Sequence, residues 1–210
     1  MDKHSNLVPR YTSSERGNHW FTAVMFVLVA LSGLTFFDPA FFFFSDLFGG
    51  GTWARILHPF LGVVLLITFL GLVARFVRDN RITDADREWG RHLGKILRNR
   101  ASNLPEIGKY NLGQKYLFWL LVVTIPLAAV SGMLIWQPYF APAFGVTVLR
   151  IAVVIHALSA FLAIAAIMVH IYAAIWTKGS VGAMTRGVVS ESWARHHHPA
   201  WYRKVVKGTK

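Results

Sequence analysis

Four long apolar runs without a charged residue alternate with polar segments along the chain. They cover residues 20–37, 56–74, 116–136 and 151–176. A helix needs about 20 predominantly apolar residues to cross the hydrocarbon core of a bilayer. The pattern therefore predicts an all-α integral membrane protein, a four-transmembrane-helix bundle in a single domain over residues 1–210. A signal peptide is the alternative for the first run, but the run exceeds the usual h-region of about 7 to 15 residues and no A-x-A-like site follows.

Composition agrees with a membrane protein. Hydrophobic residues make up 54% of the chain and charged residues only 15%, against about 25% charged residues in an ordinary soluble domain. The net charge of +12 could indicate a nucleic-acid binder, but Lys and Arg lie between the apolar runs instead of covering one soluble face. We therefore expect no nucleic-acid partner. The absence of cysteine excludes thiolate zinc sites, cysteine-ligated iron–sulfur clusters and c-type haem attachment, so any metal must use histidine or carboxylate ligands.

The distribution of basic residues predicts the orientation. Three Lys or Arg lie in residues 1–18, ten in the loop 75–115 and seven in the tail 177–210, whereas the two remaining connections carry one each, Arg55 and Arg150. Cytoplasmic segments carry the excess of basic residues. Both termini, the long loop and the tail are therefore predicted to be cytoplasmic. Within the loop, Trp89, Leu93, Ile96 and Leu97 recur at helical spacing over residues 84–98, which favours an amphipathic surface helix or a solvated helix with a small apolar seam.

Histidines are the candidate functional residues. His4, His92 and the run His196 to His198 fall in basic, solvated segments, and we expect them at the surface. The other four lie in or at the edge of the apolar runs: His19, His58, His156 and His170. Ionisable groups at membrane depth are costly and indicate function by default.

Depth sorts these four histidines into two pairs. His19 and His170 lie toward the cytoplasmic side, and His58 and His156 toward the outer side. The 14 residues from His156 to His170 return the side chain to within about 40° of the same helix face and separate the two backbones by about 21 Å. Two levels with two imidazoles each are what two bis-histidine b-type haems require, whereas zinc would want four ligands. The alternative is that each histidine is a packed, hydrogen-bonded residue.

Several segments resemble the cytochrome b, or gamma, subunit of respiratory membrane-bound formate dehydrogenase. They are RYTSSERGNHW (10–20), RILHPFLG (55–62), KYNLGQK (109–115), WQPYFAPAF (136–144), IHALSA (155–160), MVHIYAAIWTKG (168–179) and HHPAWYR (197–203). The histidine-bearing segments alone are shared with the diheme cytochromes b of nickel–iron hydrogenases and other quinone-linked reductases. The YNLGQK, PYFAPAF and HHPAWYR segments are more specific to formate dehydrogenase.

The resemblance implies a set of ligands, cofactors and partners. It implies that His58 and His156 hold an outer haem b, that His19 and His170 hold an inner haem b, and that Asn111, Gly113 and Gln114 contact menaquinone or ubiquinone beside the inner haem. The partners implied are an iron–sulfur (beta) subunit and a molybdenum or tungsten catalytic (alpha) subunit, in the bacterial inner membrane.

The resemblance also implies the role of the chain within an enzyme. This subunit would pass electrons to quinone and anchor the complex, and formate chemistry would reside elsewhere, since the chain has no cysteine to bind clusters. Two alternatives are a cytochrome b of a hydrogenase or other reductase, and a non-redox membrane anchor or transporter. For Asn111 and Gln114 the alternative is helix capping at the start of the third run.

Overall fold

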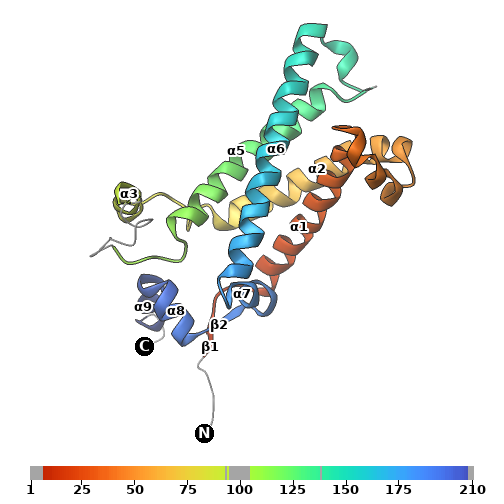
Figure 1. Cartoon of the computed structure of the whole chain (residues 1–210). Helices are drawn as coiled ribbons and strands as arrows, with labels where there is room; N and C mark the ends of the chain where they lie inside the picture. The colour runs from red at the N-terminus through yellow and green to blue at the C-terminus, as the bar shows by residue number, and fades with distance from the viewer. Residues whose placement is uncertain (1–6, 93, 95–104, 138, 208–210) are drawn as a thin grey trace. The chain divides into compact units, whose positions relative to one another are not determined.

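Four long apolar helices dominate the computed structural model (Figure 1). The structure describes residues 7–92, 94, 105–137 and 139–207. The long helices are α1 (Ser13–Leu34), α2 (Gly51–Phe76), α5 (Leu112–Leu134) and α6 (Val146–Trp176). Each is long and apolar enough to cross a membrane, so the four predicted spans are confirmed as helices.

The helices begin four to seven residues before the predicted apolar runs, because each helix also includes the polar or charged residues that bound its run. At the start of α1, the Thr12 backbone N–H donates to Glu15 Oε2 over 2.7 Å, and the Glu15 N–H donates to Thr12 Oγ1 over 3.2 Å. This reciprocal capping box satisfies N–H groups that lack intrahelical partners. Hydropathy alone did not predict these turns.

Large apolar side chains are exposed along all four helices. Val154 is 66% exposed, Ile175 70% and Trp176 76%. Soluble monomers rarely expose continuous apolar surface of this extent, and such surfaces mark contact with lipid or with other subunits. The chain is therefore a multi-pass membrane protein with four candidate spans.

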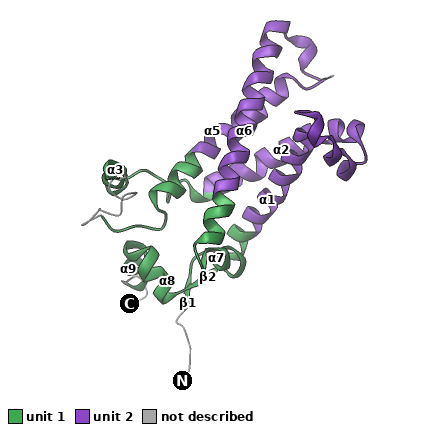
Figure 2. Cartoon of the chain, viewed as in Figure 1, with its two compact units in different colours: residues 1–16, 75–119, 170–210 green, residues 17–74, 120–169 purple. Residues whose placement is uncertain are grey.

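The chain divides into two compact units, coloured separately in Figure 2. Unit 2 comprises residues 17–74 and 120–169 and holds most of the four long helices. Its core includes Phe69 of α2, Ile125 of α5 and Ala163 of α6, with Phe26 of α1 packed against them. Every boundary between the units falls inside a long helix, so the units are not successive domains, and the single domain stays a prediction.

Unit 1 comprises residues 1–16, 75–119 and 170–210. Strand β1 (Leu7–Pro9) pairs antiparallel with β2 (Val188–Ser190), with Val8 opposite Val189. The tail also forms helices α7 (Ser180–Arg186), α8 (Glu191–His197) and α9 (Pro199–Lys207). Val8, Ala183, Val189 and Ala194 form a small buried core there. The tail is therefore folded, which the sequence analysis did not predict.

The long loop contains helix α3 (Asp84–Arg91) at the start of the predicted amphipathic segment. Thr83 caps it in a capping box with Asp86. Residues 93 and 95–104 lie outside the described residues, so the predicted helix beyond His92, including Leu93, Ile96 and Leu97, stays a prediction.

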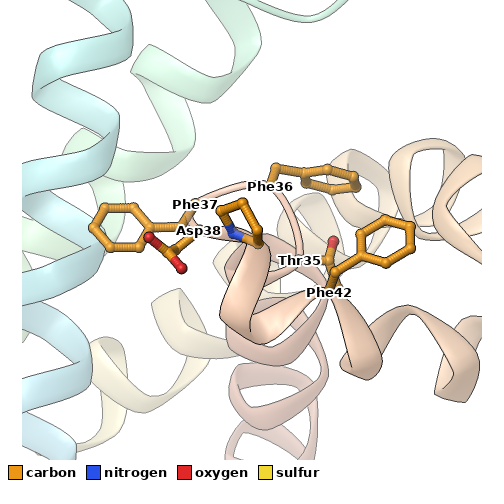
Figure 3. A pocket seen from close by; sticks show the side chains of 6 residues that line it. Thr35, Phe36, Phe37, Asp38 and Phe42 are labelled. Carbon is orange, nitrogen blue, oxygen red and sulfur yellow. The ribbon is translucent and has the colours of Figure 1, made fainter.

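The two remaining connections each carry a short 3-10 helix, η1 (Pro39–Phe48) and η2 (Ala141–Ala143). A cavity of about 410 Å³ lies where α1 gives way to η1, lined mainly by Phe36, Phe37 and Phe42 (Figure 3). The Asp38 carboxylate at this cavity accepts a hydrogen bond from the Ala40 N–H over 2.9 Å and caps η1. The only carboxylate in the lining thus has a local structural role.

Candidate functional site

The structure brings His58 of α2 and His156 of α6 together within unit 2. Their ring centroids lie 6.0 Å apart, with the ring planes at 80°. A metal–imidazole bond is about 2 Å long, so two such bonds plus the distance from each ligating nitrogen to its ring centre come to about 6 Å. The separation therefore fits one metal ion bound between the two rings, as bis-histidine ligation of haem iron requires.

Hydrogen bonds at Nδ1 assign the same tautomer to both rings. His156 Nδ1 lies 2.8 Å from the carbonyl oxygen of Ala128, and because a carbonyl only accepts, this Nδ1 carries the proton. Ser32 Oγ donates to the carbonyl oxygen of Val29 over 3.0 Å. The His58 Nδ1–H therefore donates to Ser32 Oγ over 2.9 Å. Both Nε2 atoms keep their lone pairs, and metal-ligating histidines are oriented by this kind of second hydrogen bond.

Two glycines on neighbouring helices leave room for the two rings. A Cβ added at Gly33 of α1 would lie 3.0 Å from His58 Cε1, and one at Gly132 of α5 would lie 3.0 Å from His156 Cε1. Carbon atoms in good contact lie about 3.5 to 4.0 Å apart, so any side chain at either glycine would push the ring. A Cβ at Gly62, by contrast, would meet nothing within 4 Å, which agrees with open space beside α2 one turn beyond His58.

His19 and His170 lie on α1 and α6, as predicted. His19 belongs to unit 2 and His170 to unit 1. Both side chains are partly buried. Their pairing as an inner ligand set stays a prediction.

Asn111 and Gln114 lie together at the first turn of α5. The Gln114 N–H donates to Asn111 Oδ1 and the Asn111 N–H donates to Gln114 Oε1, each over 2.9 Å. The capping interpretation of these residues is therefore what the geometry shows. Only their oxygens take part, and the side-chain NH2 groups make no hydrogen bond to any residue that the structure describes. Gly113 lies between them and is exposed.

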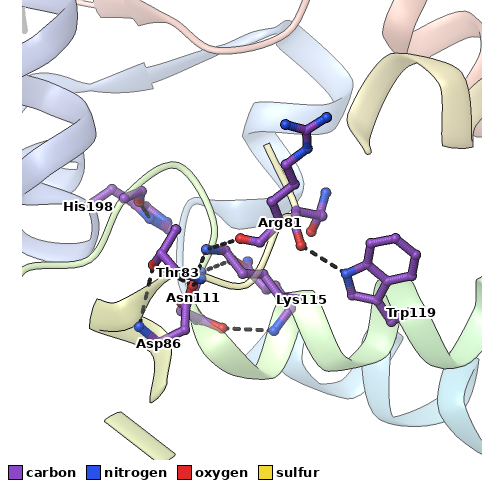
Figure 4. A network of polar contacts seen from close by, with 10 residues as sticks. Arg81, Thr83, Asp86, Asn111, Lys115, Trp119 and His198 are labelled. Atoms are coloured by element: carbon purple, nitrogen blue, oxygen red, sulfur yellow. Dashed lines mark hydrogen bonds and ion pairs between the residues drawn. The ribbon is translucent and has the colours of Figure 1, made fainter. Parts of the chain in front are cut away.

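A buried ion pair lies beside this turn (Figure 4). Lys115 Nζ contacts Asp86 Oδ2 over 2.5 Å, and both side chains are at least nine-tenths buried. Burial raises the pKa of the Asp86 carboxyl, but hydrogen bonds from Lys115 and Thr83 outweigh burial, so the net pKa lies below its ordinary value. The pair joins α3 to the first turns of α5.

The expectation of a surface position is wrong for His198, which is 3% exposed. Its Nδ1–H donates to the Gly108 carbonyl oxygen over 2.7 Å, and its Nε2 lies 3.3 Å from Arg10 Nη2. Burial and the Arg10 charge lower the pKa of His198 to about 4. The Arg10 guanidinium lies 4.7 Å from the Trp201 ring centre. His198 and Arg10 thus tie the tail to the N-terminal segment and to the loop at Gly108.

Sequence analysis missed Ser32, Gly33, Ala128 and Gly132, although a signal for three of them is present. The dipeptide Ser-Gly occurs once in the first apolar run and once in the third, at Ser32–Gly33 and Ser131–Gly132. Each glycine contacts one histidine of the pair. Small residues inside apolar helices mark places where another group approaches closely. Ala128 acts through its backbone carbonyl, which no side-chain pattern reports.

The chain is similar in sequence to a known protein family and to several of its members. The family model described as prokaryotic cytochrome b561 matches residues 10–187. The formate dehydrogenase cytochrome b556(fdo) subunit of Escherichia coli (strain K12) is 45% identical over 207 residues, covering 99% of this chain and 97% of that protein.

Two further relatives extend the comparison. The nitrate-inducible formate dehydrogenase cytochrome b556(Fdn) subunit of the same strain is 38% identical over 203 residues, covering 97% of this chain and 94% of that protein. The formate dehydrogenase cytochrome b556 subunit of Haemophilus influenzae is 36% identical over 197 residues, covering 94% and 83%. The similarity extends over the helices that carry all four candidate histidines.

Proposed function

Because the chain belongs to the prokaryotic cytochrome b561 family, and within it to the cytochrome b556 subunits of formate dehydrogenase, we propose that it is the membrane electron-transfer subunit of such a complex. It passes electrons from an iron–sulfur subunit, served by a molybdenum or tungsten catalytic subunit, to quinone, and it anchors the complex in the bacterial inner membrane. Two haems b are the carriers, and they supply reversible one-electron chemistry when bound.

One observation carries the proposal for the outer site. The ring centroids of His58 and His156 lie 6.0 Å apart, and the hydrogen bonds of their Nδ1 atoms leave the lone pair of each Nε2 available to bind a metal. Two imidazoles this close together inside an apolar helix bundle, each with an available Nε2 lone pair, support bis-histidine ligation of a haem. His19 and His170 are proposed to hold the inner haem, on the strength of their depth in the sequence and of the family.

Ligand variants test this assignment. His58→Ala and His156→Ala should each remove the same haem from the reduced-minus-oxidised spectrum, and His19→Ala and His170→Ala should each remove the other. His197→Ala, which changes a half-buried tail histidine, is the matched control and should keep both haems. Loss of different haems in the His58 and His156 variants would contradict the pairing.

The quinone end is proposed at Asn111, Gly113 and Gln114. Since the capping box uses only the oxygens of Asn111 and Gln114, their NH2 groups remain available to donate to a quinone carbonyl. Preorganised donors stabilise negative charge that develops on such an oxygen. The exposed Gly113 lets a ring approach the backbone closely.

A conservative substitution separates this role from capping. Asn111→Asp keeps an oxygen that caps α5 but removes the NH2 donor. It should keep the stability of the complex and slow haem reoxidation by added quinone at least tenfold, since loss of one such donor costs roughly 10²- to 10³-fold in known enzymes. Asn111→Ser, a second capping residue without the amide, should behave alike. Wild-type reoxidation in both variants would place the quinone elsewhere.

A further inference from the structure

A cavity of about 860 Å³ lies within unit 1. Its lining comes from the residues that follow α2, from α3, from the segment leading into α5 with the first turn of that helix, and from α9. Its volume falls within the range of about 300 to 1,000 Å³ that ligand sites occupy. None of the four candidate haem ligands lines this cavity, and of the capping box at Asn111 and Gln114 only Asn111 does.

Three cations in the lining have no acidic partner among the residues that the structure describes: Arg78, Arg81 and Lys204. The other two cations are paired, Lys109 with Asp79 over 2.7 Å and Lys115 with Asp86 over 2.5 Å. The remaining carboxylate of the lining, Glu106, pairs with Arg203 outside it. The cavity therefore carries an excess of positive charge that its own acidic residues do not balance.

The lining also has an apolar part. Trp201 and Val205 stand one helical turn apart on α9 and both face the cavity, with Lys204 beside Val205. Leu112, which is buried, and Trp89 contribute from α5 and α3. Water can hydrate an exposed cation, but it makes no favourable contact with apolar side chains. A ligand that is anionic at one end and apolar at the other suits both parts of the lining.

The position along the chain identifies the source of such a ligand. Arg78 lies two residues after α2 ends at Phe76, and α5 begins at Leu112. Both helices are candidate membrane spans, so these residues lie at the level where lipid headgroups meet water. Basic pockets at the ends of membrane helices are suited to anionic headgroups.

We propose that this cavity binds an anionic phospholipid, with the headgroup phosphate at Arg78, Arg81 and Lys204 and the first part of the acyl chains against Trp201 and Val205. The site borders the proposed quinone contact at Asn111, whereas Gly113 and Gln114 do not line the cavity. The lipid therefore joins α9 to the ends of α2 and α5. The inference does not depend on the haem or quinone assignments.

Lipid binding to the intact complex tests the proposal. The complex, purified in a neutral detergent, is titrated with dioleoylphosphatidylglycerol, and lipid retained per complex is measured by native mass spectrometry. Dioleoylphosphatidylcholine has the same chains without net charge, and glycerol 3-phosphate and inorganic phosphate supply the anion without chains. The triple variant Arg78→Gln, Arg81→Gln, Lys204→Gln is compared with a control of equal charge change, Arg75→Gln, Arg87→Gln, Arg195→Gln, whose exposed cations lie outside the cavity lining.

Each basic residue near a phosphate contributes roughly fivefold to affinity. The cavity variant should therefore bind phosphatidylglycerol at least tenfold and up to about a hundredfold more weakly, whereas the control should change by less than about twofold. Equal affinity of the wild type and the cavity variant, or of phosphatidylcholine and phosphatidylglycerol, would overturn the proposal. Displacement of the lipid by glycerol 3-phosphate or phosphate at the same concentration would show that the cavity binds a free anion instead of a phospholipid.

Two readouts keep the test decisive. The haem spectrum of each variant reports whether unit 2 is intact, since no variant residue lies there. If the triple variant fails to assemble, Arg78→Gln and Lys204→Gln alone, each at an exposed position, should weaken phosphatidylglycerol by roughly fivefold. Unchanged binding in both single variants would overturn the proposal.

Discussion

Gly132→Ala tests whether the packing of His156 matters for the outer haem. The added Cβ would lie 3.0 Å from His156 Cε1 and 3.1 Å from His156 Nδ1. Ordinary carbon contacts lie at about 3.5 to 4.0 Å, so the ring must shift by about 0.5 Å. Metal–ligand distances tolerate only about 0.2 Å, and the same shift would disturb the 2.8 Å hydrogen bond to Ala128.

The substitution does not weaken the helix itself, because Ala exceeds Gly in helix propensity by about 1 kcal/mol. We therefore expect a folded complex in which the outer haem is lost or its midpoint potential is shifted, while the inner haem is unchanged. The assay is a potentiometric titration followed at the haem absorption bands. Gly33→Ala should affect the same haem through His58, and Gly17→Ala, where an added Cβ meets nothing within 4 Å, is the control. Wild-type titrations in both Gly33→Ala and Gly132→Ala would show that the close packing of these glycines against the two rings does not control the haem.

Three further outcomes are expected. Lys115→Met leaves the Asp86 carboxylate buried without its partner, which should destabilise the start of α5 by about 3 to 5 kcal/mol and speed proteolysis of the 75–115 loop. The double variant Lys115→Met, Asp86→Asn should recover part of the protease resistance. If it does not, loss of the ion pair is not the cause. The pKa of His198 is lowered to about 4 in the folded tail, against 6.5 in the unfolded chain, so the folded tail binds fewer protons. Its stability should therefore be full above pH 6.5 and fall by up to about 3 kcal/mol toward pH 4. Protease resistance of the tail measured against pH tests this, and an equally steep pH dependence in His198→Gln would contradict it. Because the chain has no cysteine, single cysteine variants show which side of the membrane a residue lies on. A membrane-impermeant maleimide added to intact cells should label Asp46→Cys and leave Ser192→Cys unlabelled. Labelling of Ser192→Cys would reverse the predicted orientation.

The sequence was sufficient to predict the four membrane helices, because each contains a long charge-free run, which is the feature that hydropathy detects. It was insufficient for their first turns, where Thr12 and Glu15 cap α1 through hydrogen bonds instead of burial. It also missed the folded tail. The contacts of His198 join residues 90 and 188 positions apart, and no local pattern encodes contacts of that separation.

The sequence predicted which two histidines of unit 2 lie together. Depth along two helices paired His58 with His156, and the structure places these rings together. What orients the rings was not predictable, because Ser32 and Ala128 act from α1 and α5, and helix register between spans does not follow from hydropathy. Asn111 and Gln114 show a second limit of prediction from sequence. The pair caps α5 through its side-chain oxygens and keeps its NH2 groups available as donors, so the sequence pattern does not distinguish capping from ligand binding.

The haem content of the purified complex shows directly whether the chain is a diheme cytochrome b. A pyridine haemochrome assay gives haem b per copy of this chain, and acid–acetone extraction shows whether the haem is noncovalent. With no cysteine in the chain and four histidines in the membrane helices, we expect two haems b per chain, all of them extractable. One haem per chain, none, or haem that stays attached after extraction would contradict it.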